Sequence, residues 1–184
     1  MYSTAEYTKK VAPKLKDTLS KKNINAVPKI TKICVNVGAG KLANKDKKVI
    51  NEIVENLSAI TGQKPVVRMS TKAISNFKLR ENMPIGVSVT LRGQRMYDFL
   101  NRVVNTVFPR IRDFRGFSIR SFDGQGNYAV GIKEHTVFPE INPDDIVTIH
   151  GIQINIQTSA DNDEEAYHLL KSYNFPFKEK EFNA

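Results

Sequence analysis

The sequence predicts an α+β fold, built from a mainly antiparallel sheet with amphipathic helices packed on one face and the other face left open. Two observations support this prediction. Several short segments alternate apolar and polar residues, as half-buried strands do, and several longer ones repeat apolar residues at helical spacing. The chain has 184 residues, enough to bury one core without disulfides or metals, so we expect a single domain over residues 1–184.

Four segments have the apolar spacing of amphipathic helices. Three of them cover residues 3–19, 46–60 and 161–173, and the inward residues of the fourth run from Met96 to Val107. Pro13 should kink or restart the first helix, because proline lacks an amide donor. Gly62 lies where a C-terminal glycine cap belongs, and the third helix should end before Pro109. The acidic first turn of the last helix suits the helix dipole.

Six further segments have the patterns of strands, and they cover residues 29–37, 65–69, 85–91, 117–122, 127–134 and 146–158. In the first of them, Ile33, Val35 and Val37 point one way, and Asn36 points the other. The Asp-Gly-Gln-Gly stretch at 123–126 has the composition of a turn between two of these strands.

Charge is distributed unevenly along the chain. Lys and Arg number 28 against 19 acids, a formal net charge of +9. Residues 1–80 hold 17 basic and 5 acidic side chains, a net of +12, whereas residues 81–184 hold 11 and 14, a net of −3. A basic surface attracts a polyanion and releases its counterions, which favours a nucleic-acid partner. A merely soluble protein with lysine-rich faces is the alternative.

The outward faces of the predicted strands carry neutral hydrogen-bonding groups and arginines, mostly without acids. These residues are Asn36, Arg68, Ser88, Thr90, Arg92, Gln153, Asn155 and Gln157. Such a face can serve as a platform for RNA sugars, phosphates and base edges. A solvated polar face, which is common in antiparallel sheets, is the alternative. No aromatic pair suited to base stacking is present, so recognition of a structured RNA by shape and backbone fits better.

A basic segment lies between Lys64 and Arg80 and contains no acid. Its basic residues are Lys64, Arg68, Lys72, Lys78 and Arg80, and Phe77 is its one aromatic. This loop can approach a nucleic-acid backbone while Phe77 anchors it. Alternatively, Phe77 fills the core and the lysines are only solvated.

No pattern in the sequence indicates catalysis, a metal site or a cofactor. The glycines at Gly38 and Gly40 lack the spacing of a phosphate loop. The three histidines share no metal-ligand spacing, and each is expected at the surface or with satisfied ring nitrogens. The single cysteine, Cys34, forms no intrachain disulfide, and no signal peptide or membrane span is evident. We therefore expect a cytoplasmic non-enzyme.

Several blocks of sequence resemble a known family in family order over nearly the whole chain. They are VPKI at 27–30, NVGAG at 36–40, GQKP at 62–65, PIG at 84–86, VTLRG at 89–93, PRIRDFRG at 109–116, SFDGQGNY at 121–128, FPEI at 138–141, DEE at 163–165 and FPF at 175–177. The sequence is accordingly identified as a member of the bacterial large-subunit ribosomal protein family uL5, which binds 5S rRNA.

The resemblance implies a ribosome-bound structural constituent of the large subunit that attaches 5S rRNA to the central protuberance. Its implied partners are 5S rRNA, 23S rRNA, P-site tRNA, other 5S-associated large-subunit proteins and a protein of the small-subunit head, with no membrane. Family positions for the 5S rRNA contact match Asn36, Gln63 and Thr90. Short neutral side chains allow close approach of the RNA backbone, and Lys64, Arg68 and Arg92 would add the salt-dependent part of binding.

The resemblance implies two further contacts. The tRNA contact would use the loop residues Lys72, Phe77, Lys78 and Arg80, although Thr71 and Asn76 stand where the family usually has Arg and Gly. The bridge to the small-subunit head is assigned to Arg110, Arg112, Arg115, Glu140 and Asp144.

Overall fold

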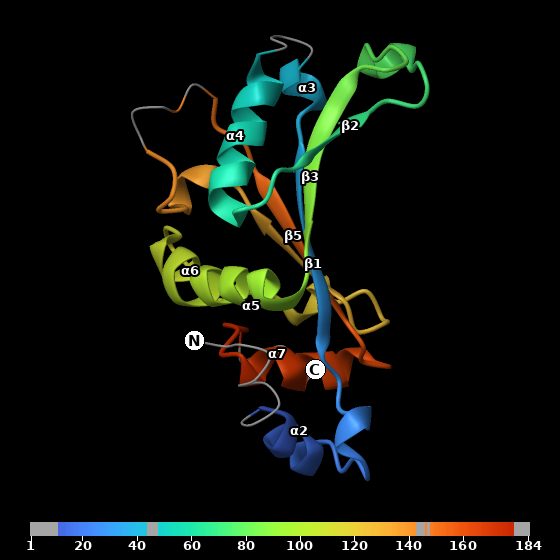
Figure 1. Cartoon of the computed structure of the whole chain (residues 1–184), viewed down its shortest axis with the longest axis vertical. Helices are drawn as coiled ribbons and strands as arrows, with labels where there is room; N and C mark the ends of the chain where they lie inside the picture. Colours follow the sequence, from blue (N-terminus) through green and yellow to red (C-terminus); the bar gives the residue numbers. More distant parts are fainter. Residues whose placement is uncertain (1–10, 44–47, 143–145, 147, 179–184) are drawn as a thin grey trace. The chain divides into compact units, whose positions relative to one another are not determined.

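The computed structural model describes residues 11–43, 48–142, 146 and 148–178 (Figure 1). Five strands form one antiparallel sheet in the order β2-β3-β1-β5-β4, and helices accompany it. The α+β fold class predicted from the sequence is confirmed. The strands are β1 (Ile30–Gly38), β2 (Val66–Met69), β3 (Pro84–Leu91), β4 (Tyr128–Ile132) and β5 (Ile152–Thr158). The α-helices are α2 (Ala12–Thr18), α3 (Gly40–Ala43), α4 (Val49–Thr61), α5 (Gly93–Arg102), α6 (Phe108–Arg110) and α7 (Asp163–Ser172).

The chain divides into two compact units. The first comprises the described parts of Met1–Ile33, Arg92–Val130 and Asn155–Ala184, and the second comprises those of Cys34–Leu91 and Gly131–Ile154. Three strands contribute residues to both units, and the single domain over residues 1–184 stays a prediction.

The core of the second unit lies between α4 and the aliphatic side of β1 and β3. Alternation along β1 is as predicted, since Val35 and Val37 are fully buried while Asn36 is half-buried. On α4 the buried face includes Ile53 and Leu57, and the helix contacts β2 and β3 (Figure 1). The helix ends as predicted at Gly62, whose φ of 67° is left-handed and whose N–H donates to the Ser58 carbonyl.

Aromatic rings make up much of the core of the first unit. The Phe108 ring meets Phe117 and Phe175 edge-on, with centroids 4.6 and 5.2 Å apart. The turn predicted at 123–126 is present. Helix α7 holds it in place, because the Asp163 carboxylate accepts hydrogen bonds from the N–H groups of Gly124 and Gly126 at 3.1 and 2.9 Å. Each of these bonds joins segments about forty residues apart in the sequence.

Helix predictions were mostly confirmed, with one error at a boundary. The predicted end before Pro109 is wrong, because a π-helical turn at Val103–Val107 leads into α6, which contains Pro109. Proline is tolerated in the first turn of a helix, where no N–H donor is needed. Only part of the predicted first helix can be compared, since residues 1–10 lie outside the described part of the chain. There Pro13 stands in the first turn of α2.

Two strand predictions were wrong. The segment 117–122 is a 3-10 turn at Ile119–Ser121, in which the Ser118 hydroxyl accepts the Arg120 N–H at 3.2 Å. Local side-chain capping and aromatic packing therefore prevail over strand pairing there. The last strand begins at Ile152 rather than at 146, because residues 148–151, which include His150, have an irregular backbone.

Within the described residues, no helix combines the length and apolar character needed to cross a membrane.

Candidate nucleic-acid interface

None of the five described strands contains an aspartate or a glutamate. We use "polar sheet face" for the outward side chains of β1, β2 and β3 in the second unit, namely Cys34, Asn36, Val66, Arg68, Ser88 and Thr90. All of them retain partial or full exposure, while the opposite side of β1 and β3 is mostly buried. The polar sheet face thus offers hydrogen-bonding groups and a positive charge without a repelling carboxylate on the strands.

The register between β1 and β3 aligns the neutral residues of this face. Cys34 Sγ lies 3.6 Å from Thr90 Oγ1, and the Ala39 N–H donates to the Ile85 carbonyl at 2.9 Å. These two pairings define a single antiparallel register. In this register Asn36 stands beside Ser88, so the two predicted residues Asn36 and Thr90 lie on neighbouring strands of the same face.

Gln63 joins this face from the turn after α4. Its side-chain Nε2 donates to the Thr90 carbonyl at 3.2 Å, which fixes the turn against β3. The buried Thr61 hydroxyl donates to the Leu57 carbonyl at 2.6 Å and accepts the Gln63 N–H at 3.4 Å. The strand pattern alone did not indicate Gln63; its place directly after the glycine cap is the local signal that could have done so.

Arg68 is the positive group nearest the centre of the polar sheet face. Its Nε donates to Ser88 Oγ at 2.9 Å across the β2–β3 pair. Lys64 is exposed just before β2, and Arg92 is exposed just after β3. Five of the six predicted 5S rRNA-contacting residues thus belong to the second unit, and Arg92 begins a segment of the first.

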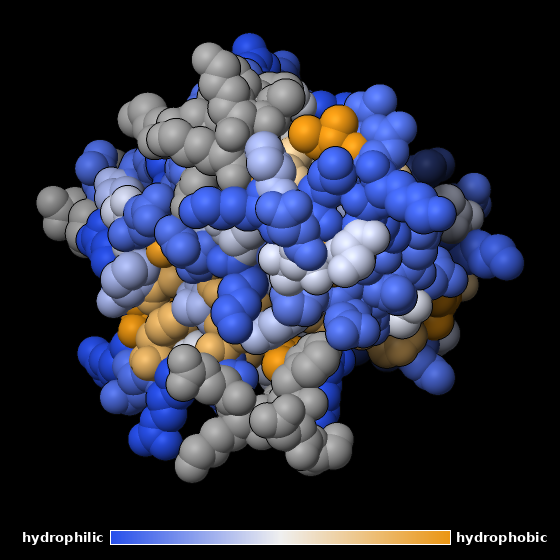
Figure 2. Space-filling view, turned by 90° about the horizontal axis from the view of Figure 1, so that it is seen from below, coloured by the Kyte–Doolittle hydropathy of each residue, from blue (hydrophilic) through white to orange (hydrophobic). Residues whose placement is uncertain are grey.

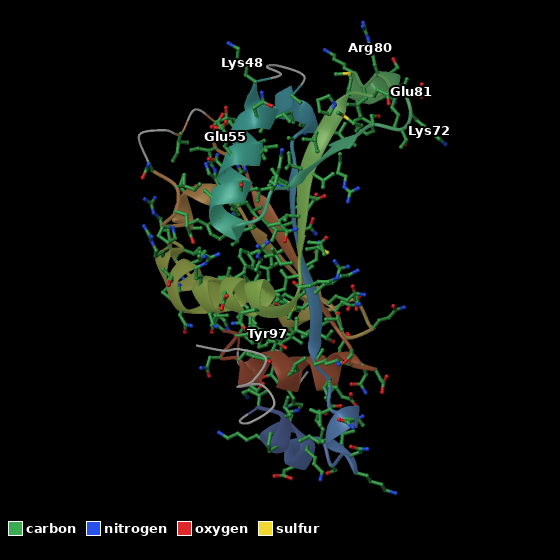
Figure 3. All side chains as sticks on the ribbon, in the orientation of Figure 1. Lys48, Glu55, Lys72, Arg80, Glu81 and Tyr97 are labelled. Atoms are coloured by element: carbon green, nitrogen blue, oxygen red, sulfur yellow. The ribbon has the colours of Figure 1, made fainter. Side chains whose placement is uncertain are left out.

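The segment 70–83, which we call the basic loop, joins β2 to β3 and is itself hydrogen-bonded. The Ser70 N–H donates to the Met83 carbonyl at 2.7 Å, and Ile74 and Leu79 exchange backbone bonds of 3.0 and 3.1 Å. The loop therefore continues the two strands as a narrow hairpin. Figure 3 labels Lys72, Arg80 and Glu81 near its end.

All four predicted tRNA-contacting residues of the basic loop are exposed. Phe77 is 66% exposed, so the alternative in which it fills the core is wrong. Other large apolar side chains of β2 and the loop are also exposed, namely Val66, Met69 and Ile74. Sequence periodicity did not indicate that they are exposed, because the strand and the loop segments that hold them are too short to show a buried side.

The residues assigned to the small-subunit bridge fall in different units. Arg110 ends α6 in the first unit, where Arg112 and Arg115 are also exposed, whereas Glu140 is half-buried in the second unit. Asp144 lies outside the described residues.

Figure 2 shows a face of the molecule on which hydrophilic residues predominate, with smaller hydrophobic areas between them.

Two histidines meet in the second unit, which contradicts the expectation of surface or satisfied histidines. The rings of His135 and His150 are buried and stacked, with centroids 4.0 Å apart and planes 2° apart. His135 Nε2 and both ring nitrogens of His150 have no hydrogen-bond partner among the described residues. Burial lowers the pKa of both rings, and the neighbouring His135 further lowers that of His150, to about 4. Among the described residues, no three potential ligands gather to hold a metal ion.

The fold and the site together define a class of protein: an α+β chain with an acid-free polar sheet and an exposed basic hairpin. Family comparisons place it more closely. Residues 23–80 match the family model "Ribosomal protein L5", and residues 84–177 match a second model, which describes the C-terminus of the same ribosomal protein family.

Relatives with the name "Large ribosomal subunit protein uL5" match almost end to end. The protein of Halothermothrix orenii is 52% identical over 95% of this chain and 97% of its own length. Those of Francisella philomiragia and Chloroflexus aggregans are each 53% identical, over 94% and 95% of this chain and 96% of their own. The chain therefore belongs to the ribosomal protein uL5 family. This is a family of structural ribosomal proteins without enzymatic activity, so the predictions of the family and of a non-enzyme are confirmed.

Proposed function

We propose that this protein is a constituent of the large ribosomal subunit that binds 5S rRNA through the polar sheet face and attaches it to the central protuberance. The observation that carries the proposal is the alignment of Asn36 beside Ser88, next to Thr90, on strands that hold no acid. The names of the relatives support the large-subunit assignment.

The side chains of this face suit a ribose-phosphate backbone. Asn36, Ser88 and Thr90 are short and neutral, so RNA can approach the sheet closely, and Asn36 and Thr90 can exchange hydrogen bonds with its 2′-hydroxyl and phosphate oxygens. Gln63 stands at the edge of the same surface and is held by its bond to Thr90. Exposed Lys64, Arg68 and Arg92 supply the salt-dependent attraction.

The proposal extends to the remaining partners. The exposed side chains of Lys72, Phe77, Lys78 and Arg80 support a contact of the basic loop with P-site tRNA. Exposed Arg110, Arg112 and Arg115, together with Glu140, are proposed for the bridge to a small-subunit head protein. Contacts with 23S rRNA and other 5S-associated proteins, in a cytoplasmic ribosome, complete the proposal.

The test is binding of the full chain to 5S rRNA at about 50 and 200 mM salt, with an unrelated structured RNA as competitor. Preference for 5S rRNA that survives the higher salt supports readout by a shaped polar surface. Equal binding to both RNAs that collapses with salt would reject the 5S assignment and favour a general RNA-binding protein.

A further inference from the structure

Ser88 lies at the centre of the polar sheet face, between the two strands that flank β3. On one side the β1–β3 register places Asn36 beside it. On the other side Ser88 pairs with Val66 of β2, and Arg68 is its diagonal neighbour. The Arg68 side chain bends toward this position and donates its Nε–H to the Ser88 hydroxyl at 2.9 Å.

The bond with Ser88 uses one N–H donor of the Arg68 guanidinium, and the remaining donors are available for a ligand. Arginine carries five N–H donors in a rigid plane, and the four on its terminal nitrogens stay outside the bond with Ser88. Those terminal nitrogens form the fork that pairs with two oxygens of one phosphate. A long exposed side chain otherwise samples many rotamers, and fixing it before binding reduces the entropy lost when the phosphate arrives.

We propose that Ser88 is a positioning residue, which holds the Arg68 guanidinium ready for a backbone phosphate of the RNA on the polar sheet face. This inference rests on the proposed function, which supplies the RNA, and it adds a residue that orients the Arg68 guanidinium toward that RNA. Three features favour a phosphate as the ligand: Arg68 is exposed, the strands hold no acid that could claim it, and Asn36 beside Ser88 can hydrogen-bond the adjoining ribose.

A double-mutant cycle tests this role on the full chain. The dissociation constant is measured for wild type, Ser88→Ala, Arg68→Ala and the double variant, against 5S rRNA and against the unrelated structured RNA. Ser88→Ala should weaken binding to both RNAs roughly three- to tenfold, as expected for one lost hydrogen bond. In the Arg68→Ala background the same change should have no further effect, because Ser88 acts through Arg68.

Further variants separate positioning from other roles. Ser88→Thr keeps the hydroxyl and should restore wild-type binding. Arg68→Lys keeps the positive charge but lacks the planar fork, so it should weaken RNA binding as much as Ser88→Ala does. Because Arg68 is exposed, this variant tests the proposal even if Ser88→Ala fails to fold. Ser58→Ala on α4 removes a half-buried serine away from the polar sheet face, and it should bind like wild type.

Each result decides the question. Wild-type binding by Ser88→Ala, or by Arg68→Lys, would overturn the proposal. An equal loss from Ser88→Ala with and without Arg68 would also overturn it, because Ser88 would then contact RNA itself. The 5S assignment is judged separately, by the ratio of 5S to unrelated RNA for wild type. Wild type can show no preference for 5S rRNA while the double-mutant cycle still shows coupling between Ser88 and Arg68 on both RNAs.

Discussion

The polar sheet face and the basic loop belong to the same unit, yet they present different surfaces. On the sheet, short neutral side chains are half-buried and aligned by strand register, and the one arginine is tied to Ser88. On the loop, exposed Lys72, Lys78 and Arg80 share a hairpin with a phenylalanine that is 66% exposed. The sheet suits recognition by fixed geometry, whereas the loop suits attraction by charge with an apolar contact.

Replacing Gly86 should damage the sheet behind the polar face. A Cβ at this position would lie 2.8 Å from the Val37 carbonyl oxygen, a backbone atom that cannot move without distorting β1. We expect Gly86→Ala to lower the free energy of unfolding by about 1–3 kcal/mol, measured by chemical denaturation. Gly38→Ala is the control, because nothing lies within 4 Å of its Cβ. Equal effects of the two changes would contradict the close packing of β1 on β3.

Removing the Thr90 hydroxyl should weaken RNA binding more than removing a hydroxyl from the basic loop. Thr90→Ala would leave an RNA group unpaired at a closely packed contact, costing ~1–3 kcal/mol of binding free energy to 5S rRNA. Thr71→Ala changes an exposed loop residue and should alter it by less than about 0.5 kcal/mol. Titrations of 5S rRNA with both folded variants compare the two. If Thr90→Ala binds like wild type, the sheet-face assignment fails.

Acidification should destabilise the unit that carries both surfaces. The pKa of His150 is lowered to about 4 in the folded protein, from an ordinary value of 6.5. Below pH 6.5 the His150 ring binds a proton in the unfolded chain but stays neutral in the folded chain. The free energy of unfolding that this ring contributes above pH 6.5 is therefore lost progressively down to about pH 4.

We expect a loss of about 1 kcal/mol in the free energy of unfolding between about pH 8 and about pH 5.5. Urea denaturation across this range measures the loss. His150→Gln should flatten the dependence, and an unchanged slope in that variant would show that other groups cause it.

Two single lysines should separate the surfaces through their salt dependence. Lys64→Ala, beside the sheet face, should reduce the salt slope of 5S rRNA binding by about one. Lys72→Ala, on the basic loop, should leave that slope unchanged and instead reduce the slope for tRNA. Fluorescence anisotropy with each RNA over a salt series distinguishes them. If both variants change the salt slopes for 5S rRNA and tRNA equally, the sheet face and the basic loop do not bind different RNAs.

Sequence periodicity predicted the parts of the fold in which burial decides conformation. The described part of the helix predicted at 46–60 and the strands at 29–37 and 85–91 agree with the structure, because each has one mostly buried side, whereas residues 46 and 47 lie outside the described residues. It failed at 117–122, where Phe117 and Ile119 alternate with polar residues as in a strand, but the Phe117 ring packs against Phe108. Side-chain capping by Ser118 is a local competitor that alternation does not detect.

The candidate site was predictable only as far as single strands allow. Alternation placed Asn36 and Thr90 on the outward face, and family resemblance added Gln63. The bond between Arg68 and Ser88 depends on the β2–β3 register, which no single strand encodes. The stacked histidines are fifteen residues apart, one in a short 3-10 helix and the other in an irregular segment, so no sequence spacing predicted their contact.

The end of the sheet at β2 has a consequence for the behaviour of the free chain. β2 is an outermost strand, only four residues long, and its pairing with β3 is irregular between Arg68 and Met69. Short length, a charged side chain and a bulge are the features by which natural sheets discourage another strand from adding to their edge. The same arginine that faces the solvent on this strand therefore also guards against β-mediated self-association while the protein is unassembled.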